Sequence, residues 1–110
     1  MKGNSIGEFE ELVLLAVGIL KDDAYSLSIL DELKTRTGRK VLISSVHKVL
    51  SRLETKGLLE SQMGGASKER GGRSKKLYTV TGYGIKILSE SHELRTGMWN
   101  AMNEANLGLG

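Results

Sequence analysis

The most informative segment of the chain reads Ile43-Ser-Ser-Val-His-Lys-Val-Leu-Ser-Arg-Leu-Glu-Thr55, and Gly57 follows it closely. Its apolar residues recur at helical spacing and fall within about 80° of one another when the chain is wound as a helix. This face, which we expect to lie in the core, consists of Ile43, Val46, Leu50 and Leu53. We expect Ser44 or Ser45 to cap the helix and Gly57 to end it.

The opposite face of this helix is small, polar and cationic, and it carries no carboxylate. Lys48 and Thr55 point away from the core face, and His47 and Glu54 lie on the border. A merely solvated helix face usually mixes Glu with Lys, whereas a helix that enters a DNA groove must avoid negative charge. The sequence therefore predicts a DNA-reading helix, with a solvated surface as the alternative. The predicted contacts on it are Ser44, Lys48, Ser51, Arg52 and Thr55.

Two predicted strands follow, at 58–63 and 77–81, and the segment between them is rich in glycine and basic residues. Residues 64–76 hold four Gly and five Lys or Arg against one Glu. They lack the Gly-x-x-x-x-Gly-Lys-Ser/Thr pattern of a nucleotide-binding loop. The sequence indicates a hairpin with a basic tip that contacts DNA phosphates. The predicted phosphate contacts are Lys68, Arg70, Arg73, Lys75 and Lys76.

Charge is placed unevenly along the 110 residues. The net charge is +3 overall, but residues 1–33 carry −5, residues 34–78 carry +9 and residues 79–110 carry −1. The +9 block contains both the predicted reading helix and the hairpin. A polyanionic partner such as double-stranded DNA suits such a block better than a neutral partner does.

Composition excludes several classes of protein. Cysteine is absent, so disulfides, thiol catalysis and cysteine-bound zinc are excluded, and the two histidines are too few for a histidine-based metal site. The longest uncharged apolar run, 12–20, is too short to span a membrane, and acidic residues precede it where a secretory signal would be basic. No catalytic triad can be recognised. We therefore expect a cytoplasmic protein that is not an enzyme and that needs no metal, cofactor or membrane.

Two helices are expected before residue 43. Ser5-Ile-Gly-Glu8 has the spacing of a capping box, which predicts a helix over about 7–20. This helix is apolar on almost every face, so it either lies at the centre of the core or packs its second face on a partner chain. Ser26 can cap the next helix, which we expect to run to about Thr37 and to stop at Gly38.

A last helix is predicted from Gly82 to about Ala105, with Thr81 as its cap and Ile85 and Leu88 serving its first turns. Residues 106–110 form a frayed tail. The helix runs well past the last strand and has little core of its own to cover, so its apolar stripe indicates a partner helix. The predicted dimer interface comprises Phe9, Leu12, Leu15, Leu94, Met98, Trp99 and Met102.

The order of these elements predicts the fold class. Three helices, a basic hairpin and a long helix are the order of a winged helix-turn-helix with an added arm. The fold is thus expected to be mainly α with a small β-hairpin wing. Residues 1–84 would form the DNA-binding domain, and residues 85–110 the C-terminal dimerisation helix with its tail.

The chain resembles the PadR family of bacterial transcriptional regulators over a stretch from Gly7 to about Leu88. The segments that carry the resemblance are Gly7-Glu-Phe-Glu-Glu-Leu-Val-Leu-Leu15, Ala24-Tyr25, Val46-His-Lys-Val-Leu-Ser-Arg-Leu-Glu-Thr-Lys-Gly-Leu58, Gly71-Gly72-Arg73 and Tyr78-Thr-Val-Thr-Gly-Tyr-Gly84. The resemblance implies a homodimer that represses transcription, with an interface built from the first and last helices. Two positions depart from the family pattern: His47 stands where an aromatic residue is usual, and Ser26 where Gly is common.

These observations predict a dimeric repressor that binds a near-palindromic operator and is released by a small aromatic ligand. Trp99 and Met98 would line the ligand site, because some members of the resembled family bind flat aromatic compounds; the alternative is that they only pack the dimer. A second hypothesis is a protein-interaction module that keeps the winged helix as a scaffold and does not bind DNA. Only the first hypothesis requires the +9 block.

Overall fold

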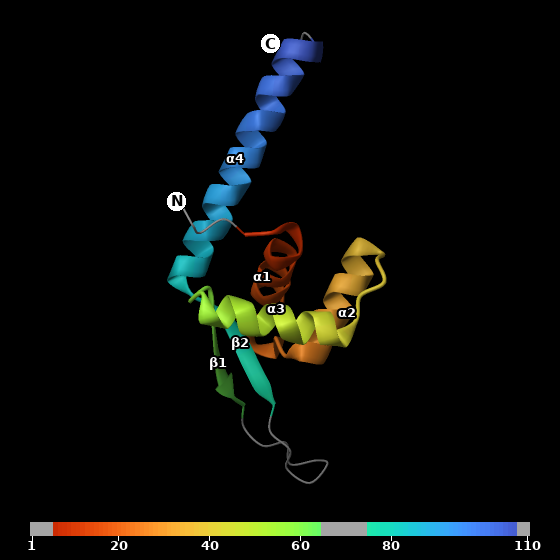
Figure 1. The fold of residues 1–110 in the computed structure, drawn as a ribbon, viewed down its shortest axis with the longest axis vertical. Helices are drawn as coiled ribbons and strands as arrows, with labels where there is room; N and C mark the ends of the chain where they lie inside the picture. The colour runs from red at the N-terminus through yellow and green to blue at the C-terminus, as the bar shows by residue number, and fades with distance from the viewer. Residues whose placement is uncertain (1–5, 65–74, 108–110) are drawn as a thin grey trace.

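The computed structural model describes residues 6–64 and 75–107 and places four helices around one core (Figure 1). The elements in chain order are α1 (Glu8–Leu20), a 3₁₀ turn η1 (Lys21–Asp23), α2 (Ser26–Thr37), α3 (Ile43–Thr55), β1 (Leu59–Met63), β2 (Lys76–Val80) and α4 (Gly82–Leu107). This confirms the predicted fold class, which is mainly α with a two-stranded hairpin and a long C-terminal helix.

The beginnings of the first three helices differ from the predicted caps. The N-cap of α1 is Gly7, whose N–H donates to Glu10 Oε1 at 2.9 Å, and the expected cap Ser5 lies outside the described residues. The N-cap of α2 is Tyr25, whose N–H donates to Ser28 Oγ at 3.0 Å, so Ser26 is already the first helical residue. In both helices, the side chain of the third helical residue accepts a hydrogen bond from the N–H of the N-cap residue. This bond satisfies a backbone donor without a hydroxyl at the N-cap itself.

The cap of α3 was also predicted wrongly. Leu42 precedes the helix, and its carbonyl accepts hydrogen bonds from the N–H groups of Ser45 and Val46. Ile43 packs against the core, which draws the chain into the helix before either serine. The predicted ends are confirmed, because Gly38 and Gly57 both adopt positive φ (68° and 81°), which a side chain would strain.

The core lies between α1, α2, α3 and the base of the hairpin. Its fully buried residues are Val13, Leu14, Val17, Ile29, Val46, Leu50, Leu53, Leu58 and Leu59. The predicted core face of α3 is confirmed, and Val49 extends it. α1 has one side in the core, while Leu15 and Ile19 on its other side are exposed. Among the residues that the structure describes, nothing covers the second apolar face of α1.

The hairpin is antiparallel, with Leu59 opposite Val80 and Met63 opposite Lys76. It is attached to the segment before α2 by a backbone hydrogen bond, in which Tyr78 N–H donates to Ala24 O at 2.8 Å. At the base of the hairpin, Thr81 N–H donates to Leu58 O at 3.1 Å. Because Ala24 is bonded to β2, the beginning of α2 has a fixed position beside the wing.

α4 begins as predicted, since Thr81 Oγ1 accepts from Gly84 N–H at 2.9 Å. Of the two apolar residues expected to serve its first turns, Leu88 packs against the core, whereas Ile85 is 56% exposed and Ile87 is buried instead. Gly84 lies against Leu58 O, where a Cβ would stand only 2.3 Å away, and this close approach sets the helix rotation. Ile87 and Leu88 follow one turn after Gly84 on the same side of the helix.

The distal part of α4 forms an arm that leaves the core (Figure 1). All residues from His92 to Met102 are exposed, and the helix continues to Leu107, two residues past its predicted end. The radius of gyration is 16.7 Å, against about 13 Å for a compact chain of this length. Most of the predicted tail, residues 108–110, lies outside the described residues. Across the ranges 6–64 and 75–107, no helix has the length and hydrophobicity needed to cross a bilayer.

Candidate nucleic-acid interface

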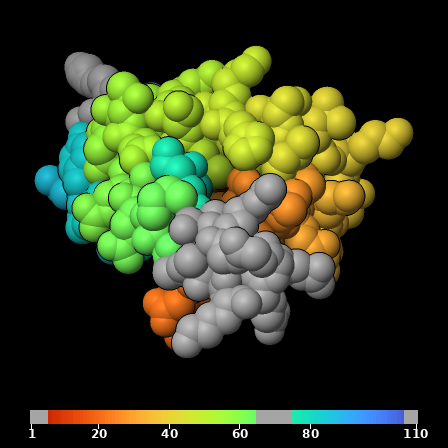
Figure 2. Space-filling view, turned by 90° about the horizontal axis from the view of Figure 1, so that it is seen from below, coloured from red at the N-terminus to blue at the C-terminus, as the bar shows by residue number. Residues whose placement is uncertain are grey.

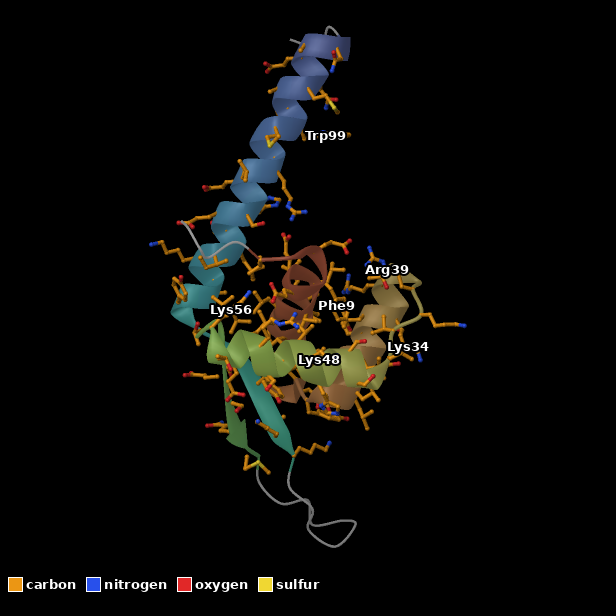
Figure 3. All side chains as sticks on the ribbon, viewed as in Figure 1. Phe9, Lys34, Arg39, Lys48, Lys56 and Trp99 are labelled. Atoms are coloured by element: carbon orange, nitrogen blue, oxygen red, sulfur yellow. The ribbon has the colours of Figure 1, made fainter. Side chains whose placement is uncertain are left out.

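The polar face of α3 is exposed along its whole length. All five residues predicted on it are exposed, and Lys48 projects from the middle of the helix (Figure 3). Leu50 and Leu53, on the opposite side of the same helix, are fully buried. The open surface of α3 is lined by His47, Lys48, Ser51, Arg52, Thr55 and Lys56. Helical periodicity thus separates a core face from a face that carries three cations and no carboxylate of α3.

One carboxylate from another helix stands at the edge of this face. Glu10 of α1 is only 7% exposed, and both of its oxygens accept hydrogen bonds from Lys56 Nζ at 3.1 Å. Arg52 Nη1 lies 3.7 Å from Glu10 Oε2. Arg52 is therefore drawn toward α1. No local pattern around residue 10 or residue 56 indicates this cluster.

The environment of Glu10 favours its ionised form. Burial by itself would raise the pKa of this carboxyl, but the Gly7 N–H, the Lys56 ammonium and the Arg52 guanidinium together lower the pKa below its ordinary value of 4.5. Glu10 is consequently a permanent anion at neutral pH that holds two basic side chains of α3 in place.

The wing contributes two described cations to the same region. Lys75 Nζ lies 4.0 Å from the centre of the Tyr25 ring, and Lys76 Nζ lies 5.6 Å from that of Tyr78. Lys76 also lies 3.6 Å from Glu54 Oε1, so part of its charge is balanced. The other predicted phosphate contacts, Lys68, Arg70 and Arg73, lie outside the described residues.

These elements share one face of the molecule. Seen from below, α3, part of α2 and the strands of the hairpin form a continuous surface (Figure 2). The arm of α4 extends in the opposite direction (Figure 1). Of the predicted residues of α3, Ser51 lines one cleft together with Lys75 and Lys76. Lys48 lies on this side of the molecule, apart from Trp99 on the arm (Figure 3).

The residues predicted for a dimer interface fall into two groups. Phe9 and Leu12 are partly buried against the core of their own chain, and Phe9 lies beside Leu42 and Ser45. The exposed group is completed by Ile19, which the sequence analysis missed although it lies one turn beyond Leu15. The exposed members are Leu15, Ile19, Leu94, Met98, Trp99 and Met102.

The residues predicted for a ligand site stand on the arm. Met98 is 66% exposed and Trp99 is 60% exposed, so one chain alone does not enclose them. In the described parts of the chain, no three His, Asp or Glu side chains gather in a way that would hold a metal ion.

Comparison with known proteins identifies the family. The model of the transcriptional regulator PadR-like family matches residues 14–90. The fold is similar to that of a PadR-like regulator from Bacillus cereus, with a TM-score of 0.71 and 22% identity, covering 93% of this chain and 92% of that one. A PadR family regulator from Clostridium difficile has a TM-score of 0.68 and 21% identity, covering 87% and 96%. One from Eggerthella lenta has a TM-score of 0.67 and 23% identity, covering 89% and 85%.

Comparison with curated proteins found no significant match. The solved relatives are described as transcription regulators and not as enzymes. The family match covers most of the helices and the hairpin described above. On this evidence the chain belongs to the PadR-like family of transcriptional regulators.

Proposed function

We propose that this protein is a homodimeric repressor that acts in the cytoplasm by binding a near-palindromic operator in double-stranded DNA. The observation that carries the proposal is the exposed face of α3, where Lys48 stands among small hydroxyl side chains with no carboxylate of the same helix. Lys48 and Ser51 would donate to base edges in the major groove, and Lys75 and Lys76 on the wing would bind the flanking phosphates. The three basic residues outside the described part would add to the wing's contacts.

The dimer would be formed by α1 and α4. The apolar residues of the arm lie within an arc of about 140° that also contains Ile87, the residue that packs α4 on the core. The arm therefore continues the core-facing side of α4 beyond the end of the core. Glu11 and Arg95 join α1 to α4 at the beginning of this overhang, with 3.0 Å between their charged atoms. A second chain would cover both the arm and the exposed side of α1, and so remove two apolar patches that a soluble monomer avoids.

The proposed effector is a small, flat aromatic compound. Trp99 and Met98 would face the other chain, and a gap between the two chains would offer an apolar site with an indole wall. Binding there would change the separation of the two α3 helices, which must match half-sites about one turn of DNA apart. Release of the operator would follow.

The decisive experiment selects bound duplexes from a random DNA pool at fixed salt and then measures their affinity against salt concentration. We expect the logarithm of the binding constant to fall by about 0.9 per phosphate contact for each tenfold increase in salt. Lys48→Ala should weaken binding to the selected site by about 1–3 kcal/mol. Lys86→Ala removes the same charge from α4 and serves as the control, with little expected effect.

The protein-interaction hypothesis predicts a different result. A scaffold that has lost DNA binding would enrich no sequence, and its weak association with DNA would not change when Lys48 is replaced. Either result would exclude the operator-binding role.

A further inference from the structure

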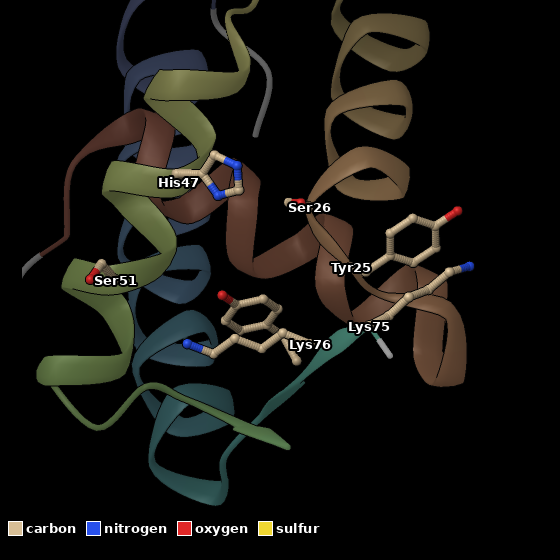
Figure 4. A pocket seen from close by; sticks show the side chains of 7 residues that line it. Tyr25, Ser26, His47, Ser51, Lys75 and Lys76 are labelled. Atoms are coloured by element: carbon tan, nitrogen blue, oxygen red, sulfur yellow. The ribbon is translucent and has the colours of Figure 1, made fainter. Parts of the chain in front are cut away.

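A cleft lies between the first turn of α2, the middle of α3 and the beginning of β2, and the DNA contacts proposed above give no role to its residues Tyr25, Ser26, His47 and Tyr78 (Figure 4). Its volume is about 450 Å³. Tyr25 and Ser26 line it from the beginning of α2, His47 and Ser51 from α3, and Lys75, Lys76 and Tyr78 from the wing. These seven side chains come from three separate parts of the sequence.

The chemistry of the cleft suits an anion. Each side chain that lines it carries a hydroxyl, an imidazole or an ammonium group, and none carries a carboxylate. The Lys75 ammonium is held over the Tyr25 ring, 4.0 Å from its centre. Among the described residues, no carboxylate lies within ion-pair distance of Lys75, whereas Lys76 lies 3.6 Å from Glu54. The cleft therefore holds one cation whose charge is not balanced by the described residues.

Tyr78 provides a further donor in the cleft. It also lines the cleft, and the residue is only 7% exposed. Its backbone N–H is bonded to Ala24 O, which fixes Tyr78 beside the beginning of α2. Its phenol hydroxyl can donate a hydrogen bond to an acceptor bound in the cleft.

The first turn of α2 adds backbone donors. Tyr25 is the N-cap and offers no side-chain acceptor, and Ser28 Oγ already accepts from Tyr25 N–H. Tyr25 and Ser26 line the cleft, so the beginning of α2, with the positive end of the helix dipole, lies beside it. The 2.8 Å bond from Tyr78 N–H to Ala24 O holds this turn beside β2, so the donors are positioned before any ligand arrives.

We propose that this cleft binds one phosphodiester group of the DNA backbone and thereby sets the position of α3 relative to the wing. This inference rests on the proposed function. Lys76 is balanced by Glu54, so the charge of Lys75 with several neutral donors remains. This matches the single negative charge of a phosphodiester better than the charge of about −2 on a free phosphate monoester at neutral pH. The cleft lies between the two elements proposed to touch DNA, as a backbone contact that fixes their register requires. The proposal thereby gives a role in DNA binding to four further residues, Tyr25, Ser26, His47 and Tyr78.

The test introduces a carboxylate into the cleft with the fold unchanged. Ser26→Glu places an acid in the first turn of α2, where a negative charge favours the helix, so the variant should fold. Leu27→Glu is the matched control, because Leu27 is exposed in the same turn but does not line the cleft. Both variants change the net charge by the same amount. Affinity for a 20-base-pair duplex would be measured by fluorescence anisotropy at several salt concentrations, with thermal unfolding as the check on folding.

We expect Ser26→Glu to weaken binding at least tenfold and to reduce the salt dependence by about one phosphate contact, while Leu27→Glu changes affinity less than threefold. Equal losses of DNA affinity in the two variants would show a general charge effect and overturn the proposal. A Ser26→Glu variant that binds DNA as tightly as wild type would also overturn it. Wild-type protein that binds no duplex at low salt would overturn the proposed function itself.

A second arm separates DNA from a free anion. Inorganic phosphate would be titrated into the full chain, and amide resonances of residues 26–28 would be followed by NMR. One outcome would assign the cleft to a free anion and overturn the phosphodiester assignment. In that outcome, wild type saturates at submillimolar phosphate and Ser26→Glu abolishes this binding, but Ser26→Glu leaves the affinity for DNA unchanged. No saturation below about 10 mM, together with the expected loss of DNA binding, would support it.

Discussion

Glu10 and Lys56 lie 46 positions apart in the chain, and they are joined by two hydrogen bonds of 3.1 Å. The pair connects the beginning of α1, which we propose to contact a second chain, with the end of the proposed DNA-reading helix α3. Arg52 shares the same carboxylate. A shift of α1 at the dimer interface would therefore be transmitted directly to two basic residues of α3.

Replacing this carboxylate should lower stability. Glu10→Gln leaves Lys56 and Arg52 without their anion, and we expect the free energy of unfolding to fall by about 1–3 kcal/mol. Glu8→Gln is the control, because Glu8 pairs with Arg39 in an exposed position where solvent screens the ion pair and its contribution to stability is small. Urea denaturation of both variants measures the difference, and equal losses would contradict a special role for Glu10.

The same residue predicts a pH dependence. The folded protein lowers the pKa of Glu10 below 4.5, so the unfolded chain takes up the proton first as the pH falls. The stabilisation is fully present above the ordinary pKa of 4.5, and it is lost as the pH falls through the lower pKa of Glu10 in the folded state. We expect wild type to lose more stability than Glu10→Gln between neutral pH and about pH 3. Parallel stability curves for the two proteins would refute this assignment.

Gly84 should tolerate no side chain. A Cβ there would stand 2.3 Å from Leu58 O and 2.8 Å from Val80 Cγ1, so Gly84→Ala must separate α4 from the hairpin. We expect a loss of about 1–3 kcal/mol in the free energy of unfolding. Gly97→Ala in the same helix meets no atom within 4 Å and should be neutral or stabilising by up to about 1 kcal/mol. Thermal unfolding of the two variants provides the comparison, and a similar effect at both positions would exclude the steric explanation.

The arm predicts a dimer that one charge should disrupt. Met98→Glu places a carboxylate within the apolar stripe, whereas Asn100→Glu places it on the opposite side of α4. Sedimentation at micromolar concentration should show a dimer for wild type and Asn100→Glu, and a shift toward monomer for Met98→Glu. A monomeric wild-type protein would disprove the interface.

Trp99 should report on the same interface. It is the only tryptophan, and it is 60% exposed in a single chain. If the arms pair, its emission should be blue-shifted in the native dimer and should move to the red in Met98→Glu. Added flat aromatic compounds should quench or shift it if the dimer holds an effector site. A dimer with buried Trp99 that responds to none of them would keep the interface and remove the effector site.

Much of the fold could be predicted because the relevant signals are local. Helical spacing in 43–55 identified which side of α3 is buried. Gly38 and Gly57 marked the helix ends, because the chain takes a positive φ at both positions and this depends on neighbouring residues only. The hairpin followed from two strand-like segments, 58–63 and 77–81, on either side of a glycine-rich basic segment. The PadR-like family could be recognised from these same local segments.

What could not be predicted depends on contacts between distant segments. The rotation of α4, which buries Ile87 and exposes Ile85, is set by Gly84 meeting Leu58 across the hairpin. Glu10 met Lys56 only because α1 and α3 pack together, and Tyr25 met Lys75 only because Ala24 bonds to β2. Spacing along the chain specifies which face of an element is apolar, but it carries no information about which polar groups on other elements will lie opposite. Those pairings follow from the packing of the core, and they place both the Glu10 cluster and the proposed phosphate cleft.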